Sequence, residues 1–282
     1  MTLKTLDVPG LLRSHGLTPR KGLGQNFLTD PIVLDKVVDA AGVTAEDAVL
    51  EIGPGLGSLT RHLARAARQV TAIEIDGNLI PLLQQVLAAE HNVRVIHADI
   101  LELDPADIMG GDPYLVVANI PYYITSAILR HLLDSSNRPQ RLVLTVQREV
   151  AERICAAPGD LSLLALSVQV YGSPRPVLRI PAGAFYPPPK VDSITLRIDL
   201  HPQPRIPSVR LDTFFKLARA GFSQKRKTLR NALSGGLGWK TDQGAQLLQA
   251  AQIDPQRRAE TLTIDEWARL TAEFLEENIK AV

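Results

Sequence analysis

The stretch Tyr114-Leu115-Val116-Val117-Ala118-Asn119-Ile120-Pro121-Tyr122 indicates both the fold and the place of its site. Its first five residues form a continuous apolar run, which is typical of a strand buried on both faces of a parallel sheet. Directly after this strand, where open α/β sheets bind their ligands, come Asn119, Pro121 and Tyr122. An amide oxygen and a flat ring together suit a planar amine, such as that of a nucleobase. The alternative interpretation is a simple strand-to-helix turn around the proline.

Around this stretch, strand-like and helix-like segments alternate along the first 200 residues. We predict strands at 48–52, 69–75, 93–98, 114–118 and 141–146, and helices at 60–68, 79–89, 125–133, 149–156 and 161–171. This alternation predicts an α/β fold with a mostly parallel sheet and helices on both faces. Residues 193–198 alternate polar and apolar side chains, which predicts a half-exposed strand at the edge of the sheet.

The chain changes character near His201. Residues 201–207 contain three prolines and predict a linker. Helical patterns follow at 211–222, 225–233, 242–251 and 264–278. We therefore predict two domains, an α/β domain over residues 1–200 and a small helical domain over residues 201–282.

Composition narrows the class of protein. Of the 282 residues 45% are hydrophobic, enough for a substantial core, and no apolar run approaches the roughly 20 residues of a membrane span. The first four residues, Met1-Thr2-Leu3-Lys4, lack the long apolar stretch of a secretory signal. The single cysteine, Cys155, excludes an internal disulfide and a cysteine-rich metal site. We expect a cytoplasmic protein without a bound metal.

A glycine-rich loop and three polar residues follow consecutive predicted strands. The loop Glu51-Ile52-Gly53-Pro54-Gly55-Leu56-Gly57 lets backbone approach a ligand closely, but its spacing and its proline differ from the dinucleotide fingerprint. Each of the next three strands ends near an acid or amide: Glu74, Asp99 and Asn119. Any one of them alone is typical of a turn or a helix cap. Because parallel strands deliver all four to one edge, the set predicts a nucleoside pocket, with Glu74 accepting from ribose hydroxyls.

Basic residues concentrate just after the predicted linker, although the net charge of the whole chain is only +1. Residues 201–230 contain eight Lys or Arg and one acid, Asp212, a local excess of seven positive charges. The densest part comprises Lys225, Arg226, Lys227 and Arg230. Such a surface is often only solvated, but beside a nucleobase pocket it favours binding to the phosphates of a nucleic acid.

Five segments in this order closely resemble those of the rRNA adenine N6-dimethyltransferases: 25–28 (Gln-Asn-Phe-Leu), 51–57, 119–122, 147–153 and 185–193. The resemblance runs from Lys21 into the C-terminal helices and is strongest to the branch that modifies two adjacent adenosines in the 3′-terminal hairpin of small-subunit rRNA. It implies a Rossmann-like class I methyltransferase domain that uses S-adenosylmethionine, followed by a helical RNA-binding domain. We expect a monomer that acts on small-subunit rRNA or the pre-small ribosomal subunit.

Carried over residue by residue, the resemblance implies roles for the pocket residues. Those near the cofactor are Gln25, Asn26 and Leu28 at its methionine part, Gly53 and Gly55 by backbone, Glu74 at its ribose, Asp99 and Ile100 at its adenine, and Asn119. Those at the target adenine are Asn119, the Pro121 carbonyl, Tyr122 and, stacking on the other side, Phe185. The adenine amine is a poor nucleophile because its lone pair is delocalised, and two acceptors favour the pyramidal nitrogen that can attack.

The sequence departs from the family pattern at three places. Tyr123 stands where Asn is usual, Ala127 where Pro is common, and 161–164 (Leu-Ser-Leu-Leu) where Lys-x-Tyr-Gly is common. Two other hypotheses stay open. One is the large-subunit rRNA methylase of macrolide resistance, which shares Asn-Ile-Pro-Tyr but fits the other segments less well. The second is a non-catalytic RNA-binding assembly or transcription factor, against which the intact tetrapeptide and cofactor set argue.

Overall fold

The computed structural model of the chain describes residues 3–280, with side chains up to residue 276. Met1 and Thr2, part of the segment that predicts no secretory signal, lie outside the described residues. By their contacts the residues form two units, Met1–Ala151 with Pro174–Leu200, and Glu152–Ser173 with His201–Val282. The predicted α/β domain therefore gives up one internal segment, Glu152–Ser173, which packs with the C-terminal helices.

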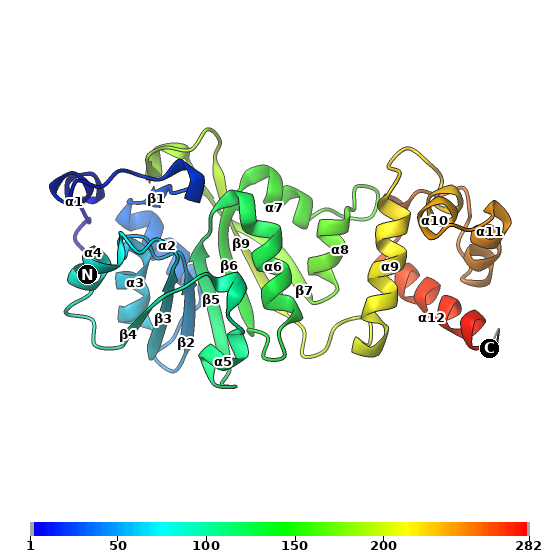
Figure 1. Ribbon diagram of the computed structural model, residues 1–282, viewed down its shortest axis with the longest axis horizontal. Helices are drawn as coiled ribbons and strands as arrows, with labels where there is room; N and C mark the ends of the chain where they lie inside the picture. Colours follow the sequence, from blue (N-terminus) through cyan, green and yellow to red (C-terminus); the bar gives the residue numbers. More distant parts are fainter. Residues whose placement is uncertain (1–2, 281–282) are drawn as a thin grey trace. The chain divides into compact units, whose positions relative to one another are not determined.

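The first unit is built on a seven-stranded sheet (Figure 1). Its strand order is β4-β3-β2-β5-β6-β9-β7. The bounds are β2 (Ala48–Ile52), β3 (Gln69–Glu74), β4 (Val93–His97), β5 (Tyr114–Asn119), β6 (Arg141–Gln147), β7 (Gly172–Ile180) and β9 (Ser193–Leu200). The five strands from β4 to β6 run parallel, and β9 runs antiparallel to β6. The predicted α/β fold class and its five parallel strands are confirmed.

The predicted edge position of residues 193–198 is wrong. Strand β9 lies between β6 and β7, and β7 forms the edge. Ser193 and Thr195 are fully buried, and the Thr195 hydroxyl lies 3.4 Å from that of Thr145 on β6. Cross-strand hydroxyl pairs let polar side chains sit inside a sheet. Strand β7 was not predicted; its prolines, Pro174 and Pro176, are tolerated at an edge because they lack an N–H.

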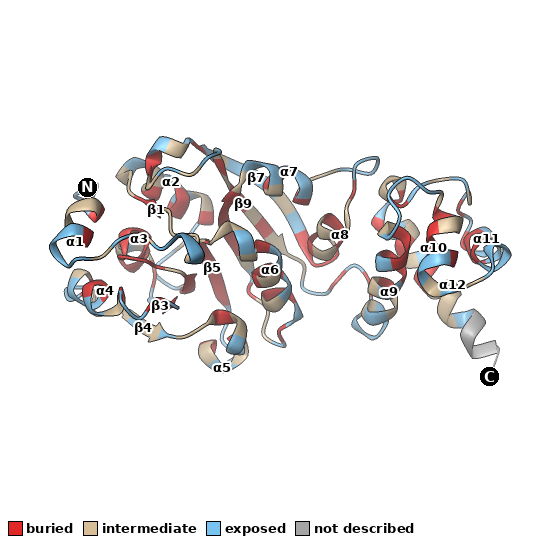
Figure 2. Cartoon of the chain, turned by 45° about the horizontal axis from the view of Figure 1, so that its top comes forward, coloured by how far each residue is buried: buried red, intermediate tan, exposed pale blue. Residues whose placement is uncertain are grey.

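Helices cover both faces of this sheet. Those of the first unit are α1 (Val8–Ser14), α2 (Pro31–Ala41), α3 (Ser58–Ala66), α4 (Ile80–Val86), α5 (Pro105–Met109) and α6 (Thr125–Asp134), and α7 (Arg148–Ile154) spans the boundary between the units. Apolar side chains of α2 and α3 pack on alternate residues of the strands, such as Val49, Val117 and Val143. Right-handed crossovers place α6 on the opposite face, as Figure 1 shows. Figure 2 shows the central strands buried between these two layers.

A second, two-stranded sheet joins distant parts of the first unit. Strand β1 (Phe27–Leu28) pairs antiparallel with β8 (Phe185–Tyr186), so that Phe27 faces Tyr186 and Leu28 faces Phe185. Both Leu28 and Phe185 are buried in the core that α2 and α3 form. This pairing fixes the segment before α2 near the carboxyl end of the main sheet.

The second unit is helical. It contains α8 (Leu163–Gln169), α9 (Leu211–Phe222), α10 (Leu229–Leu237), α11 (Thr241–Ala250) and α12 (Ile264–Lys280). The fully buried rings of Phe214 and Trp267 form the centre of its core, 6.4 Å apart in an edge-on contact. Helical character is confirmed, but the predicted start of the second helix at residue 225 is wrong, because α10 begins at Leu229. No helix among the described residues is long and apolar enough to cross a membrane.

Candidate active site

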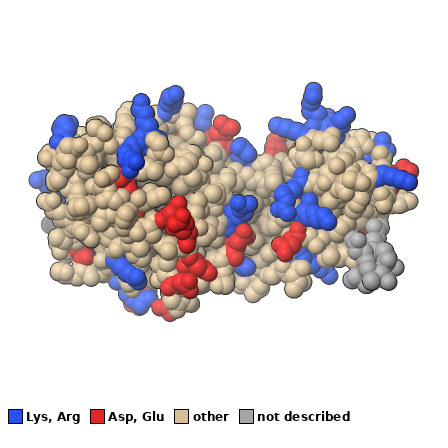
Figure 3. Space-filling model, in the orientation of Figure 1, with Lys and Arg blue, Asp and Glu red and all other residues tan. Residues whose placement is uncertain are grey.

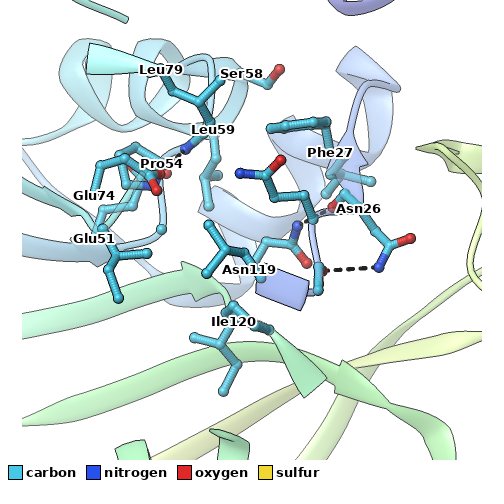
Figure 4. A pocket seen from close by; sticks show the side chains of 18 of the residues that line it. Asn26, Phe27, Glu51, Pro54, Ser58, Leu59, Glu74, Leu79, Asn119 and Ile120 are labelled. Atoms are coloured by element: carbon cyan, nitrogen blue, oxygen red, sulfur yellow. Dashed lines mark hydrogen bonds between the residues drawn. The ribbon is translucent and has the colours of Figure 1, made fainter. Parts of the chain in front are cut away.

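The carboxyl ends of β2, β3 and β5 meet around one cavity, called here the Glu74 cavity (Figure 4). Nine predicted site residues line it: Gln25, Asn26, Leu28, Gly53, Gly55, Glu74, Asn119, Pro121 and Tyr122. A neighbouring cavity of about 200 Å³, the Asp99 cavity, is lined by the predicted pair Asp99 and Ile100 and shares Gly53 and Pro121 with the first. The structure thus brings together residues that lie up to about a hundred positions apart in sequence.

The Glu74 carboxylate organises the glycine loop. Only 4% of Glu74 is exposed, and its two oxygens accept N–H groups of Gly55 and Asp76, each at 2.9 Å. Burial raises the pKa of Glu74 above its ordinary value. Gly55 has φ of +59°, and a Cβ there would stand 2.7 Å from the ring of Phe27. Only glycine therefore lets the loop close over Glu74 at this point.

One hydrogen bond fixes the orientation of the Asn119 amide. Its Nδ2 donates to the carbonyl of Asn26 at 2.9 Å, which turns the Oδ1 atom away from that contact. Among the described residues, no donor hydrogen-bonds this oxygen, so it remains an acceptor in the cavity. Asn26 is itself held by its amide, which donates to the Gly24 carbonyl at 3.1 Å. Figure 4 shows both bonds: the first links β5 to the segment before β1, and the second lies within that segment.

The residues after Asn119 add a carbonyl and a ring. The Pro121 carbonyl accepts the N–H of Ile124 at a long 3.3 Å within the 3-10 turn Tyr122–Ile124, which leaves it a second lone pair. The Tyr122 hydroxyl lies 2.6 Å from that of Ser193 on β9. Burial raises the pKa of Tyr122, so its phenol stays neutral and offers a fixed ring rather than a base.

Gln25 holds the segment before β1 against the loop after β3. Its Nε2 donates to Asp76 at 2.8 Å, and its Oε1 accepts the backbone N–H of Arg20 at 2.8 Å. Arg20 also pairs with Asp76 at 3.2 Å. Burial alone would raise the pKa of Asp76, but hydrogen bonds from Gln25, Asn78 and Arg20 hold it below its ordinary value. Asp76 was not among the predicted site residues, although its position two residues after Glu74 was a usable signal.

Glu51 is a second buried carboxyl in the wall of the Glu74 cavity. It is 1% exposed, and its Oε2 has no hydrogen-bond partner in the described part of the chain. Burial raises the pKa of Glu51 to about 8, so that it is largely protonated at neutral pH. Glu51 belongs to the predicted glycine loop, but no role was predicted for its side chain.

Two further predicted residues, Asp99 and Phe185, differ in how they lie relative to these cavities. Asp99 lines its cavity with one oxygen capping the next turn, where it accepts the Leu101 N–H at 2.9 Å. Phe185, predicted to stack on the target base, is 4% exposed and packs beside Leu28 in the core. It lines neither cavity.

The predicted RNA-binding residues belong to the second unit. Lys225, Arg226 and Lys227 are exposed in the turn between α9 and α10, called here the basic turn, and Figure 3 shows basic side chains gathered there. Within the described part of the chain, none of these three forms an ion pair. Arg230 lies on α10 and is half-buried, and its Nε atom has no hydrogen-bond partner among the residues that the structure describes. By contrast, Arg205 pairs with Asp265 at 2.8 Å.

The two cavities fit a nucleoside joined to an amino acid better than a nucleotide. Their walls carry acceptors, on Glu74, Asp99 and Asn119, that suit hydroxyl and amine donors. Pro54 has no N–H to offer a phosphate, and the Glu51 carboxyl in the same wall has an oxygen without a hydrogen-bond partner among the described residues. The residues present therefore fit S-adenosylmethionine. Within residues 3–280, no group of three or more His, Cys, Asp or Glu is arranged to hold a metal ion.

Comparison with known proteins agrees with this geometry. The family model for ribosomal RNA adenine dimethylase matches residues 16–276. A ribosomal RNA small subunit methyltransferase A from Dehalococcoides mccartyi is 48% identical over 265 residues, 94% of this chain and 91% of the relative. A dimethyladenosine transferase from Plasmodium falciparum matches with a TM-score of 0.75 and 26% identity, over 89% of this chain and 98% of that one. The 23S rRNA methyltransferase ErmE matches with a TM-score of 0.69 and 28% identity, over 88% and 99%.

Proposed function

Since this chain belongs to the ribosomal RNA adenine dimethylase family, we propose that it methylates N6 of two adjacent adenosines in the 3′-terminal hairpin of small-subunit rRNA. The choice of small-subunit rRNA as the substrate rests on relatives named ribosomal RNA small subunit methyltransferase A. The chain is 42–48% identical to these relatives over nearly their whole length. The ErmE likeness, at 28% identity, gives weaker support to a large-subunit substrate. A non-catalytic role has no support in a pocket whose acceptors are all in place.

The orientation of the Asn119 amide is the observation that supports the chemistry. With its nitrogen bonded to the Asn26 carbonyl, its oxygen is left to accept one hydrogen of the adenine amine. The carbonyl of Pro121, with a free lone pair, accepts the other. Two acceptors placed in this way favour the pyramidal nitrogen of the transition state over the planar nitrogen of the free base. Neither group removes a proton, so the methylated amine loses its proton to solvent.

The target base has to leave its stack to enter this pocket. Tyr122 offers a ring whose position is fixed by its hydroxyl contact with Ser193, and base–aromatic stacking contributes about 1–3 kcal/mol. Stacking on Phe185 stays a prediction, because its ring is packed in the core in this structure.

The cofactor residues divide between the two cavities. We assign the methionine part and ribose of S-adenosylmethionine to the Glu74 cavity, with Glu74 at the ribose and Gln25, Asn26 and Leu28 nearby. We assign its adenine to Asp99 and Ile100 in the neighbouring cavity. When bound, S-adenosylmethionine supplies an activated methyl group on a sulfonium. The chain contributes mainly alignment of the amine towards that group.

The basic turn supplies the contact to the RNA backbone in this proposal. Its three side chains are exposed and free of ion pairs among the described residues, as binding to phosphates requires. Structured RNA is recognised mainly through its shape and backbone, so no base-specific contacts are needed there. We further propose that the protein acts as a monomer in the cytoplasm.

Mapping the methylated nucleotides tests the proposal. The protein is incubated with S-adenosylmethionine labelled in the methyl group and with undermethylated small or large ribosomal subunits, and the labelled positions are mapped. We expect label on two adjacent adenosines near the 3′ end of small-subunit rRNA and none on the large subunit. Label only on large-subunit rRNA would contradict the proposed substrate, and no label on either would contradict the activity.

A further inference from the structure

Tyr123 is an exposed aromatic residue that the proposed chemistry does not use. It follows Tyr122 on the 3-10 turn Tyr122–Ile124, and 62% of its surface is exposed. It is one of six large hydrophobic residues that are exposed among the described residues, and Ile75, at 47%, is another of the six. Both Tyr123 and Ile75 line the Asp99 cavity. Two exposed apolar side chains in the wall of one cavity indicate a surface that a bound apolar group covers.

The ring of Tyr123 also lies against the segment before β1. A Cβ placed on Gly24 would stand 3.2 Å from Cδ1 and Cε1 of this ring and 3.3 Å from Cβ of Pro121. Gly24 has φ of +62°, in the region that favours glycine. The Gly24 backbone thus passes directly beside the ring, and Leu23 lines the same cavity. Three separate segments therefore contribute to the wall of the cavity that holds Asp99, through Leu23, Ile75 and Pro121 with Tyr123 and Ile124.

We propose that Tyr123 forms the outer wall of the cofactor's adenine subsite and packs on the purine opposite Ile75. The inference rests on the proposed function, because it takes the Asp99 cavity as the adenine subsite. The hydroxyl of Tyr123 has no hydrogen bond among the described residues, so the ring alone supplies the contact. Tyr123 is a positioning residue that shares its turn with Pro121 and Tyr122. A purine in the subsite therefore also steadies the loop that holds the target amine.

Calorimetric binding of S-adenosylhomocysteine tests this role without any need for methyl transfer. Base–aromatic stacking of about 1–3 kcal/mol corresponds to a 5- to 150-fold loss of affinity for Tyr123→Ala. Tyr123→Phe keeps the ring and should bind within about threefold of the wild type. 5′-Methylthioadenosine, which carries the same purine without the amino acid, should lose the same factor. The matched control is Ile32→Ala, whose side chain is 60% exposed and lines neither cavity.

The outcomes separate this inference from the proposed function. If Tyr123→Ala binds S-adenosylhomocysteine within threefold of the wild type, Tyr123 is not a wall of the subsite. An unchanged cofactor affinity with weakened RNA binding would assign the ring to the RNA instead and overturn the inference. If the wild-type protein methylates rRNA in either case, the proposed function stands. An unchanged thermal unfolding midpoint for Tyr123→Ala shows that the substitution at this exposed site leaves the fold intact.

Discussion

Replacing Asn119 with Ala tests the pocket at its most specific contact. The substitution removes an acceptor from the adenine amine at the moment when its nitrogen gains positive charge. A hydrogen bond to a charged group contributes about 1.5–3 kcal/mol, which corresponds to roughly 10- to 150-fold in rate. The variant also loses the 2.9 Å bond to the Asn26 carbonyl, which fixes the segment before β1. Since removing one preorganised hydrogen-bonding group costs about 10²–10³ in rate, we expect methyl transfer to fall at least a hundredfold.

A single-turnover assay separates this effect from cofactor binding. Labelled methyl transfer to undermethylated small subunits gives the rate, and calorimetry gives the affinity for S-adenosylhomocysteine. That affinity should stay within about tenfold, because the contacts through Glu74 and Asp99 remain. The control is Asn137→Ala, whose amide donates to the Asp112 carbonyl at 3.3 Å and lines neither cavity. Transfer by Asn119→Ala within threefold of the wild-type rate would refute the role of the amide oxygen.

Three further predictions concern pH, the glycine loop and the basic turn. Because burial raises the pKa of Glu51 from 4.5 to about 8, the folded protein retains a proton that the unfolded chain releases above pH 4.5. The free energy of unfolding should therefore fall as pH rises from 5 to 8, and in Glu51→Gln this fall should be smaller by an amount on the order of 3–4 kcal/mol. Urea unfolding at a series of pH values measures it. If the free energies of unfolding of the variant and the wild type change with pH in the same way, the prediction is wrong. Gly55→Ala should lower stability by about 1–3 kcal/mol and weaken S-adenosylhomocysteine binding, because its Cβ meets the Phe27 ring at 2.7 Å. The control for backbone strain alone is Gly110→Ala, because Gly110 has φ of +66° and a Cβ placed there would have no atom within 4 Å. If the two variants lose the same amount of stability, the clash with Phe27 is excluded as the cause. Alanine at all three positions of the basic turn, Lys225, Arg226 and Lys227, should weaken RNA binding and reduce the slope of log affinity against log salt concentration by about 2–3. An unchanged slope would show that the turn does not contact the RNA.

The α/β fold and most of the pocket could be predicted from local sequence patterns. Parallel strands buried on both faces appear as continuous apolar runs, so β2, β3 and β5 were predicted almost to the residue. Once the strands are known, right-handed crossovers bring their carboxyl ends to one edge. The residues that follow them, Glu74 and Asn119 among them, then share one cavity. Local pattern and chain connectivity are sufficient for this part of the site.

Contacts between segments far apart in sequence could not be predicted in this way and are known from the three-dimensional structure. The period of two in β9 shows that its faces differ, but not that β7 lies beside it. The bond from Asn119 to Asn26, the link from Gln25 to Asp76 and the burial of Phe185 all depend on how the segment before α2 packs at the end of the sheet. No local pattern reports such packing, because burial and close approach arise only when distant residues meet. For the same reason Tyr123, a departure from the family pattern in sequence, gained a role only beside Gly24 and Asp99.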